Sequence, residues 1–184
     1  ICAKANNIAG VQWTAMDPPL RETMLARGDV DAITGFTFTS LLNLEARGVK
    51  AEDVTVLQYP DYGVKLYGNA IIASPKLLKE NPAAVKAFLS AFTKGMKDVL
   101  AKPDVAIETV KARDGIINSA LETRRLQLAI NTVINSADAR AEGFGQVKGP
   151  RLSLMASQVS DAFNTKSRVN PDAVWNGSFL PSAA

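Results

Sequence analysis

The clearest pattern in the chain is an apolar stripe at helical spacing between residues 82 and 101. Its members recur at i, i+3, i+4, i+7, i+11 and i+14, which is the repeat of one face of an α-helix. They are Val85, Phe88, Leu89, Phe92, Met96 and Val99. Asn81 and Pro82 come just before the stripe, in the order of a helix cap and a first helical residue. We therefore predict a long helix whose stripe packs in the core.

Similar start and stop signals predict helices elsewhere along the chain. Pro18 and Pro19 open one helix, which Gly28 ends, and another covers about residues 38–47 before Gly48. Ser74 is a cap for a short helix, because Pro75 follows it. The remaining predicted helices cover residues 104–112, 121–141 and 150–164.

Short segments rich in β-branched and apolar residues predict four strands. They cover residues 11–14, 30–34, 53–59 and 69–74. The first three alternate with predicted helices, and such alternation indicates a mostly parallel sheet with right-handed crossovers. All four strands lie before residue 75, whereas helices dominate the rest. We therefore expect an α/β fold with a helix-rich C-terminal half.

Composition and charge narrow the classes of function. Hydrophobic residues make up 47% of the 184 residues, so the chain can bury a core. The net charge is a mild +3. Its basic residues are spread out rather than gathered in a stripe, so we expect no nucleic-acid partner. Histidine is absent and Cys2 is the single cysteine, which rules out a Ser–His–Asp triad or a classical zinc site within this chain. We expect no catalytic residue, no metal and no other cofactor.

Two segments carry a resemblance to a known family. In LRETMLARGDVDAITGF, a helix ends at Gly28 and Val30, Asp31 and Ala32 lead into a strand. In GNAIIASPKLLKENPAAVKAFLSAFTKG, a strand ends in two small residues and an apolar helix follows. The matching positions of this second segment are Ala73, Ser74, Leu78, Pro82, Val85, Ala87, Phe88, Leu89, Ala91 and Gly95. The ordered series resembles the substrate-binding proteins of ABC importers, in the nitrate, sulfonate and taurine group that includes NMT1-like thiamine-pyrimidine binders.

The resemblance implies a type II periplasmic-binding-protein fold. Such proteins have two α/β lobes joined by a hinge, and they bind a solute in the cleft between the lobes. Residues 1–62 would form part of the second, smaller lobe, and residues 63–184 would form the C-terminal part of the first lobe. The family has the leading strands of the first lobe ahead of this region. The chain is therefore expected to be the C-terminal part of such a protein, with its N-terminal part absent.

The first candidate ligand-binding segment is GFTFTS, at the carboxyl end of the predicted strand 30–34. Ligands of open α/β sheets bind beyond the carboxyl ends of the strands. Gly35 would let the backbone approach a ligand closely, and Phe36 or Phe38 would wall the pocket. The hydroxyls and helix-start N–H groups suit an anion and come from Thr37, Thr39 and Ser40. The alternative is a helix cap followed by two core aromatics.

The second candidate segment is DYGVKLYGN, at the hinge that the resemblance implies. Tyr62 lies at this hinge, and Tyr67 and Asn69 would face the cleft as the chain re-enters the first lobe. Tyrosine offers a ring face and a hydroxyl, and asparagine offers donors and an acceptor. In the pyrimidine-binding relatives a glutamate follows the matching tyrosine, whereas Gly68 stands here. The alternative is a turn with packed tyrosines.

The resemblance implies a binding protein without chemistry of its own. It would act in the periplasm, or outside the cell on a membrane anchor, as a monomer that delivers a small anion such as a sulfonate, taurine or nitrate to a membrane permease. Pyrimidine or thiamine-precursor binding or biosynthesis is the alternative on the same fold, although the fungal pyrimidine synthases use a histidine. A regulatory effector domain is a third hypothesis, which requires a DNA-binding helix-turn-helix in front.

Overall fold

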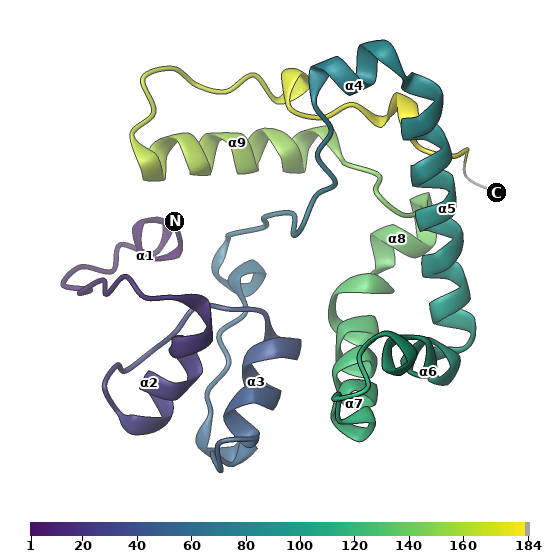
Figure 1. Ribbon diagram of the computed structural model, residues 1–184. Coiled ribbons are helices and arrows are strands. Elements are labelled where there is room, and N and C mark those ends of the chain that lie inside the picture. The colour runs from purple at the N-terminus through teal and green to yellow at the C-terminus, as the bar shows by residue number, and fades with distance from the viewer. Residues whose placement is uncertain (183–184) are drawn as a thin grey trace. The chain divides into compact units, whose positions relative to one another are not determined.

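The computed structural model describes residues 1–182, and every regular element in that range is a helix (Figure 1). The longer elements are α2 (Arg21–Arg27), α3 (Thr37–Glu45), α4 (Pro75–Glu80), α5 (Pro82–Ala101), α6 (Pro103–Arg113), α7 (Ser119–Ala129), α8 (Ala137–Glu142) and α9 (Gly149–Phe163). The shorter ones are α1 (Cys2–Ala5), η1 (Pro18–Leu20), η2 (Ala51–Asp53), η3 (Tyr59–Tyr62), η4 (Ile130–Ile134), η5 (Pro171–Ala173) and η6 (Gly177–Phe179). No helix of this range has both the length and the hydrophobicity to cross a membrane.

The predicted helix starts at Ser74 and Asn81 are confirmed. The Ser74 hydroxyl accepts a hydrogen bond from the Leu77 N–H at 3.2 Å, at the start of α4. Asn81 Oδ1 accepts one from the Ala84 N–H at 3.1 Å, in the first turn of α5. In both cases a proline occupies the first helical position, where a missing N–H costs nothing. These starts are predictable because each cap and its partner lie within three residues of one another.

The predicted end of α2 is also confirmed, and it requires a glycine. Gly28 has φ +74°, in the left-handed region that residues with a Cβ rarely adopt. The Gly28 N–H donates to the Leu25 carbonyl at 3.0 Å, and the Asp29 N–H donates to the Met24 carbonyl at 2.9 Å. The last carbonyls of α2 therefore have partners, and the chain leaves the helix here.

The single helix predicted over residues 121–141 is wrong, because the structure divides this range between three elements. α7 ends at Ala129, a π-helical turn covers η4, and α8 begins at Ala137. The Thr132 hydroxyl donates to the Leu128 carbonyl at 2.7 Å, and the Asn135 N–H donates to the Ile130 carbonyl at 3.0 Å. Side-chain bonding to a carbonyl four residues back competes with the regular helical ladder. The apolar spacing alone could not show this interruption.

The four predicted strands are wrong for the described residues. Residues 11–14, 30–34 and 69–74 contain no strand and no helix. Residues 53–59 run from the end of η2 to the start of η3, without a strand between them. A strand is stabilised by its hydrogen-bonded neighbour, and residues 1–182 contain no strand pairing. The segment 69–74, expected to be a buried strand, leaves Ile72 90% exposed. The α/β sheet is therefore not confirmed.

The chain forms two compact units, each assembled from segments that are distant in the sequence. The first comprises Ile1–Val11, Leu57–Gly95 and the chain from Ala137 onward, and the second comprises Gln12–Val56 and Met96–Ser136. The assignment of residues 1–62 to one lobe and residues 63–184 to the other comes from the family resemblance, and it stays a prediction.

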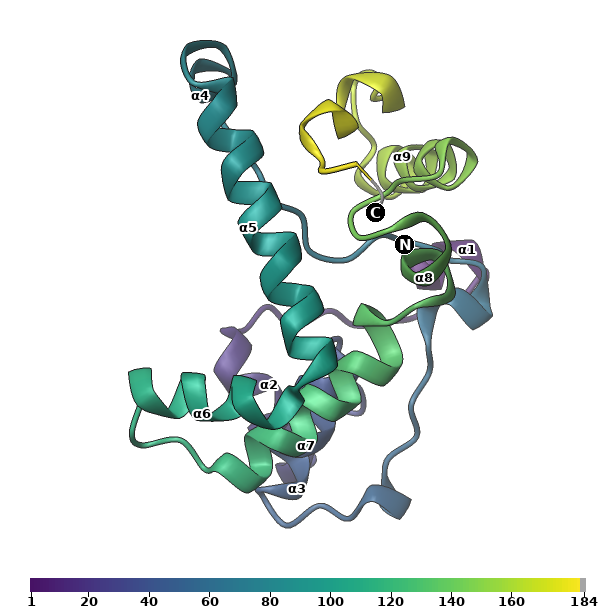
Figure 2. The ribbon, with the colours of Figure 1, turned by 90° about the vertical axis from the view of Figure 1, so that its right-hand side faces the viewer.

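The second unit is a small helical assembly. α3 contacts both α2 and α7, and α7 contacts α6, as the neighbouring ribbons in Figure 2 show. Its buried apolar residues come from α3, α6, α7 and η4. They are Leu42, Leu44, Ile107, Ala129 and Ile130. This core fixes α3, and with it residues 37–40 of the first candidate segment.

In the first unit, α9 packs against the segment that follows η3. Val64 and Leu152 are buried there. Arg151 of α9 donates to the carbonyls of Lys65 at 3.1 Å and Leu66 at 2.9 Å, and Gln158 donates to the Gly63 carbonyl at 2.9 Å. A segment without regular structure is thus held by side chains of one helix.

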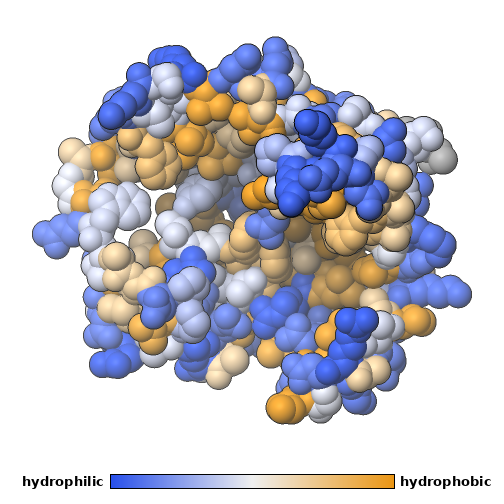
Figure 3. Space-filling view, turned by 45° about the horizontal axis from the view of Figure 1, so that its top comes forward, coloured by the Kyte–Doolittle hydropathy of each residue, from blue (hydrophilic) through white to orange (hydrophobic). Residues whose placement is uncertain are grey.

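The apolar stripe of α5 forms the predicted helix, but its packing in the core is not found. No residue of α5 is buried, and Phe88 is 56% exposed. The Phe88 and Phe92 rings stack on each other with centroids 6.2 Å apart. Hydrophobic residues also gather at the surface of the face drawn in Figure 3. The helical period therefore predicted the element correctly, whereas burial depends on a packing partner that the period does not specify.

Candidate functional site

The first candidate segment, Gly35 to Ser40, forms the entry into α3. Phe36 is the cap residue, in an extended conformation, and α3 begins at Thr37. The N–H groups of Thr39 and Ser40 both donate to the Phe36 carbonyl, at 2.9 and 2.8 Å. The cap residue is a phenylalanine without a side-chain capping bond, so none of the hydroxyls in this segment serves as the cap.

The two phenylalanines of this segment form a stacked pair. Their ring centroids lie 5.3 Å apart with an interplanar angle of 23°. Phe36 is 44% exposed, whereas Phe38 is half-buried. The alternative of two core aromatics does not hold for Phe36 in the described structure. A partly exposed ring backed by a second ring can stack on a flat ligand.

Ser40 makes the most buried polar contact of the segment. Its hydroxyl donates to Oε1 of Glu22 at 2.7 Å, and Glu22 is 2% exposed. Gly35 lies against the same hydroxyl, because a Cβ added at Gly35 would clash with Ser40 Oγ. The glycine is needed for this close approach. A solute at this site would therefore find the Ser40 oxygen as an acceptor, since its proton is directed to Glu22.

Arg125 of α7 holds the first turn of α3 from a second direction. Its Nη1 donates to the Phe38 carbonyl at 3.1 Å, and its Nη2 donates to Asn43 Oδ1 at 3.4 Å. Glu122 accepts from Nε at 3.1 Å and completes the charge pairing. The Arg125 side chain is only 22% exposed, so these bonds are partly shielded from water. α2 and α7 together fix the candidate segment.

Sequence reasoning missed both anchors. Glu22 lies in the first turn of α2, beside Leu20, Met24 and Leu25, the apolar residues that would be expected to form the buried face of the helix. In the structure Leu20 is half exposed, and the carboxyl group is buried instead. Charged residues are rarely buried without a partner, and the partner of Glu22 is 18 positions away, so no local pattern indicates it.

The second candidate segment lies in the other unit, and Tyr67 is its most constrained residue. The Tyr67 hydroxyl accepts a hydrogen bond from the backbone N–H of Lys148 at 2.8 Å. The backbone N–H of Tyr67 donates to Met155 Sδ at 3.4 Å. The guanidinium of Arg151 lies 4.2 Å from the ring centroid, which is cation–π geometry. One face and the hydroxyl of this ring are therefore occupied by α9 and the residue before it.

Tyr62 and Asn69 are more open. Tyr62 ends η3 and is 42% exposed, and its carbonyl accepts from Asn6 Nδ2 at 3.0 Å. Gly63 follows with φ +78° and redirects the chain. Asn69 is exposed in a segment without regular structure. These two side chains can reach solvent-borne ligands without breaking contacts within their own unit.

The charges next to Tyr67 form a small network on α8 and the start of α9. Lys148 Nζ lies 2.8 Å from Asp138 and 3.1 Å from Glu142, and Arg151 also pairs with Asp138 at 3.4 Å. The hydrogen bond from Lys148 holds the pKa of Asp138 below its ordinary value, and Asp138 in turn raises the pKa of Lys148. These cations are paired with carboxylates, so they do not offer an open anion site.

The structure thus brings Gly35, Phe36, Thr37, Phe38, Thr39 and Ser40 together in one unit, and Tyr62, Tyr67 and Asn69 in the other. Their joint role in one cleft stays a prediction. Within residues 1–182, no three His, Cys, Asp or Glu side chains are grouped so that they could hold a metal ion.

Comparison with known protein families gives one match. The family described as NMT1/THI5 like matches residues 5–106, a range that contains all nine candidate ligand-binding residues. That family has a fold of the periplasmic-binding type. The comparison with curated proteins gave no match, and neither did the comparison with solved structures.

Proposed function

This chain belongs to the NMT1/THI5-like family, and from that premise we propose that it is the solute-binding component of an ABC importer. It captures a small solute in the cleft between two lobes and delivers it to a membrane permease, without chemistry of its own. It acts in the periplasm, or outside the cell on a membrane anchor. The observation that carries the proposal is the coincidence of the matched range with both candidate segments.

The proposed solute is a small anion, such as a sulfonate, taurine or nitrate. The start of α3 supports this choice, because the N-terminal end of a helix attracts negative charge. Thr37 and Thr39 place hydroxyls in this turn. Taurine fits best among the three, because its ammonium group can donate to the Ser40 oxygen while its sulfonate meets the helix start.

A pyrimidine or thiamine precursor is the second candidate, and the ring pair at the start of α3 favours it. The exposed face of Phe36 can stack on a heteroaromatic ring, with Phe38 as support. The Ser40 oxygen can accept from an exocyclic amino group. Against this candidate stands Gly68, in the place of the glutamate that the pyrimidine-binding relatives have.

Isothermal titration of the intact protein with taurine, nitrate and a 4-aminopyrimidine tests the proposal. We expect saturable binding of one solute, which is recovered unchanged. If the bound solute is the aminopyrimidine, Phe36→Ala should weaken its binding by up to about tenfold, since an aromatic ring contact contributes about 0.5–1.5 kcal/mol. Phe163→Ala removes an exposed ring outside both segments and should leave affinity unchanged. Failure of all three solutes to bind, or conversion of a bound solute to a product, contradicts the proposal.

A further inference from the structure

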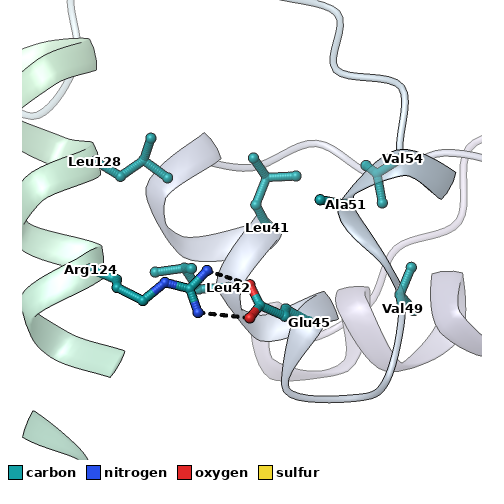
Figure 4. Close-up of a pocket in the computed structure, with 8 residues that line it drawn as sticks. All are labelled: Leu41, Leu42, Glu45, Val49, Ala51, Val54, Arg124 and Leu128. Atoms are coloured by element: carbon teal, nitrogen blue, oxygen red, sulfur yellow. Dashed lines mark hydrogen bonds and ion pairs between the residues drawn. The ribbon is translucent and has the colours of Figure 1, made fainter. Parts of the chain in front are cut away.

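A separate pocket of about 150 Å³ lies within the second unit, between α3 and α7 (Figure 4). α3 contributes Leu41 and Leu42, and α7 contributes Leu128. The remaining apolar wall comes from Val49, Ala51 and Val54, in and around η2. Leu42 is buried, whereas Leu41, Val54 and Leu128 are half-buried. None of the nine candidate solute-binding residues lines this pocket.

Size and polarity set the class of ligand that the pocket can take. Apolar side chains provide six of its eight lining residues. A pocket of about 150 Å³ can take a molecule the size of benzene. Glu45, Ala51 and Arg124 are exposed, so the pocket is open to solvent on their side, and a ring that covers the aliphatic walls removes apolar surface from water. The walls therefore suit a molecule of one or two rings.

The two charged lining residues neutralise one another at the rim. Arg124 Nη1 and Nη2 donate to Oε1 and Oε2 of Glu45, each at 2.7 Å, in the two-pronged arrangement drawn in Figure 4. An anion would have to compete with Glu45 for the guanidinium, and a cation would have to compete with Arg124. A neutral ligand has no such competition. A ring can contact the guanidinium, and a ring N–H can donate to the carboxylate.

We propose that this pocket binds a small neutral aromatic molecule, of benzene to indole size, at a site distinct from the proposed solute cleft. Leu41, Val54 and Leu128 enclose the ring, and the Arg124–Glu45 pair lies at its polar edge. The proposal does not depend on the importer role, because it rests on the pocket alone.

Indole titration followed by methyl NMR of the intact protein is the test. We expect saturable shifts of the Leu41, Val54 and Leu128 methyl signals, and no saturable shift of Val85 and Leu89 on the apolar face of α5. Val54→Phe fills the pocket and should weaken indole binding at least tenfold. Val105→Phe makes the same change at an exposed site of α6 and should leave affinity unchanged.

Folding of each variant is checked by circular dichroism. If Val54→Phe does not fold, Ala51→Phe fills the same pocket from an exposed position of η2. Loss of binding on blockade, with the Val105→Phe affinity retained, supports the proposal. Shifts that never saturate, or equal affinities of the blocked and control variants, overturn it.

Discussion

The Ser40 hydroxyl donates a 2.7 Å hydrogen bond to Glu22 Oε1, and this bond joins the candidate ligand segment to a carboxyl group that is 2% exposed. α2 and α3 are therefore linked by a partly buried polar contact. Removing one partner of a buried hydrogen bond leaves the other without compensation for its lost hydration. The contact thus makes the conformation of the candidate segment depend on the packing of α2.

Ser40→Ala should lower the free energy of unfolding by about 1–3 kcal/mol, because Glu22 then loses its buried donor. Urea denaturation followed by circular dichroism measures the change. Ser90→Ala is the matched control, since Ser90 is an exposed serine of α5, and it should change stability little. Equal effects of the two substitutions would show that the Glu22 contact contributes nothing.

Gly35→Ala should destabilise through the same contact. The added methyl would clash with Ser40 Oγ and displace it from Glu22. We expect a loss of about 1–3 kcal/mol in the natural background and a much smaller loss when Ser40 is already alanine. A double-mutant cycle measures this coupling, which contacting residues show and independent sites do not. Strictly additive losses would contradict the displacement.

The predictable parts of this fold are those whose causes lie close together in the sequence. Ser74 and Asn81 start helices by bonding N–H groups three residues ahead, and Gly28 ends one through its own backbone freedom. Composition predicts strands at residues 30–34 and 69–74, yet a strand needs a pairing partner that composition does not specify. Burial of the α5 stripe likewise needs a packing partner that the helical period does not specify, and this stripe, predicted as core, has no buried residue.

The candidate site divides in the same way. The turn from Gly35 into α3 was predictable, because a glycine, two phenylalanines and three hydroxyls follow one another in six residues. Its anchors were not, because Glu22 and Arg125 meet the segment only through the packing of α2 and α7. The adjacent arginines at 124 and 125 look equivalent in the sequence. In the structure Arg124 is exposed at a pocket rim, whereas Arg125 is half-buried and bonds to α3.

Arg125→Gln should therefore destabilise the protein by about 1.5–3 kcal/mol, the range for hydrogen bonds to charged groups. The lost bonds join the guanidinium to the Phe38 carbonyl and to Asn43. Arg124→Gln is the neighbouring control, and its effect should be much smaller because the Arg124–Glu45 pair is exposed. Urea denaturation of both variants decides the order. A larger loss for Arg124→Gln than for Arg125→Gln would contradict it.

The Arg124–Glu45 pair should show itself in the pH dependence of stability. The hydrogen bond from Arg124 holds the pKa of Glu45 below its ordinary value. A carboxyl group with a lower pKa in the folded state stabilises that state above its unfolded pKa, and this contribution is lost as pH falls through the folded pKa.

The Glu45→Gln variant should therefore be less stable than the natural protein at pH 7. This difference in stability should disappear as the pH falls below the ordinary pKa of glutamate, about 4.3. Thermal melts between pH 7 and pH 3 measure this difference. Glu108→Gln is the control, because Glu108 is exposed on α6 and makes no ion pair in the part of the chain that the structure describes. A stability difference for Glu45→Gln that stays constant over the whole pH range would rule out this origin.

Tyr67 offers a prediction that separates its hydroxyl from its ring. Tyr67→Phe removes the acceptor for the Lys148 N–H and should cost about 0.5–1.5 kcal/mol of stability. Tyr67→Leu also removes the ring under Arg151, which adds a cation–π loss of about 0.5–1 kcal/mol at a partly exposed site. Tyr62→Phe controls for loss of an exposed tyrosine hydroxyl and should change stability little. If Tyr67→Phe is as stable as Tyr62→Phe, the hydrogen bond from the Lys148 N–H does not hold this segment.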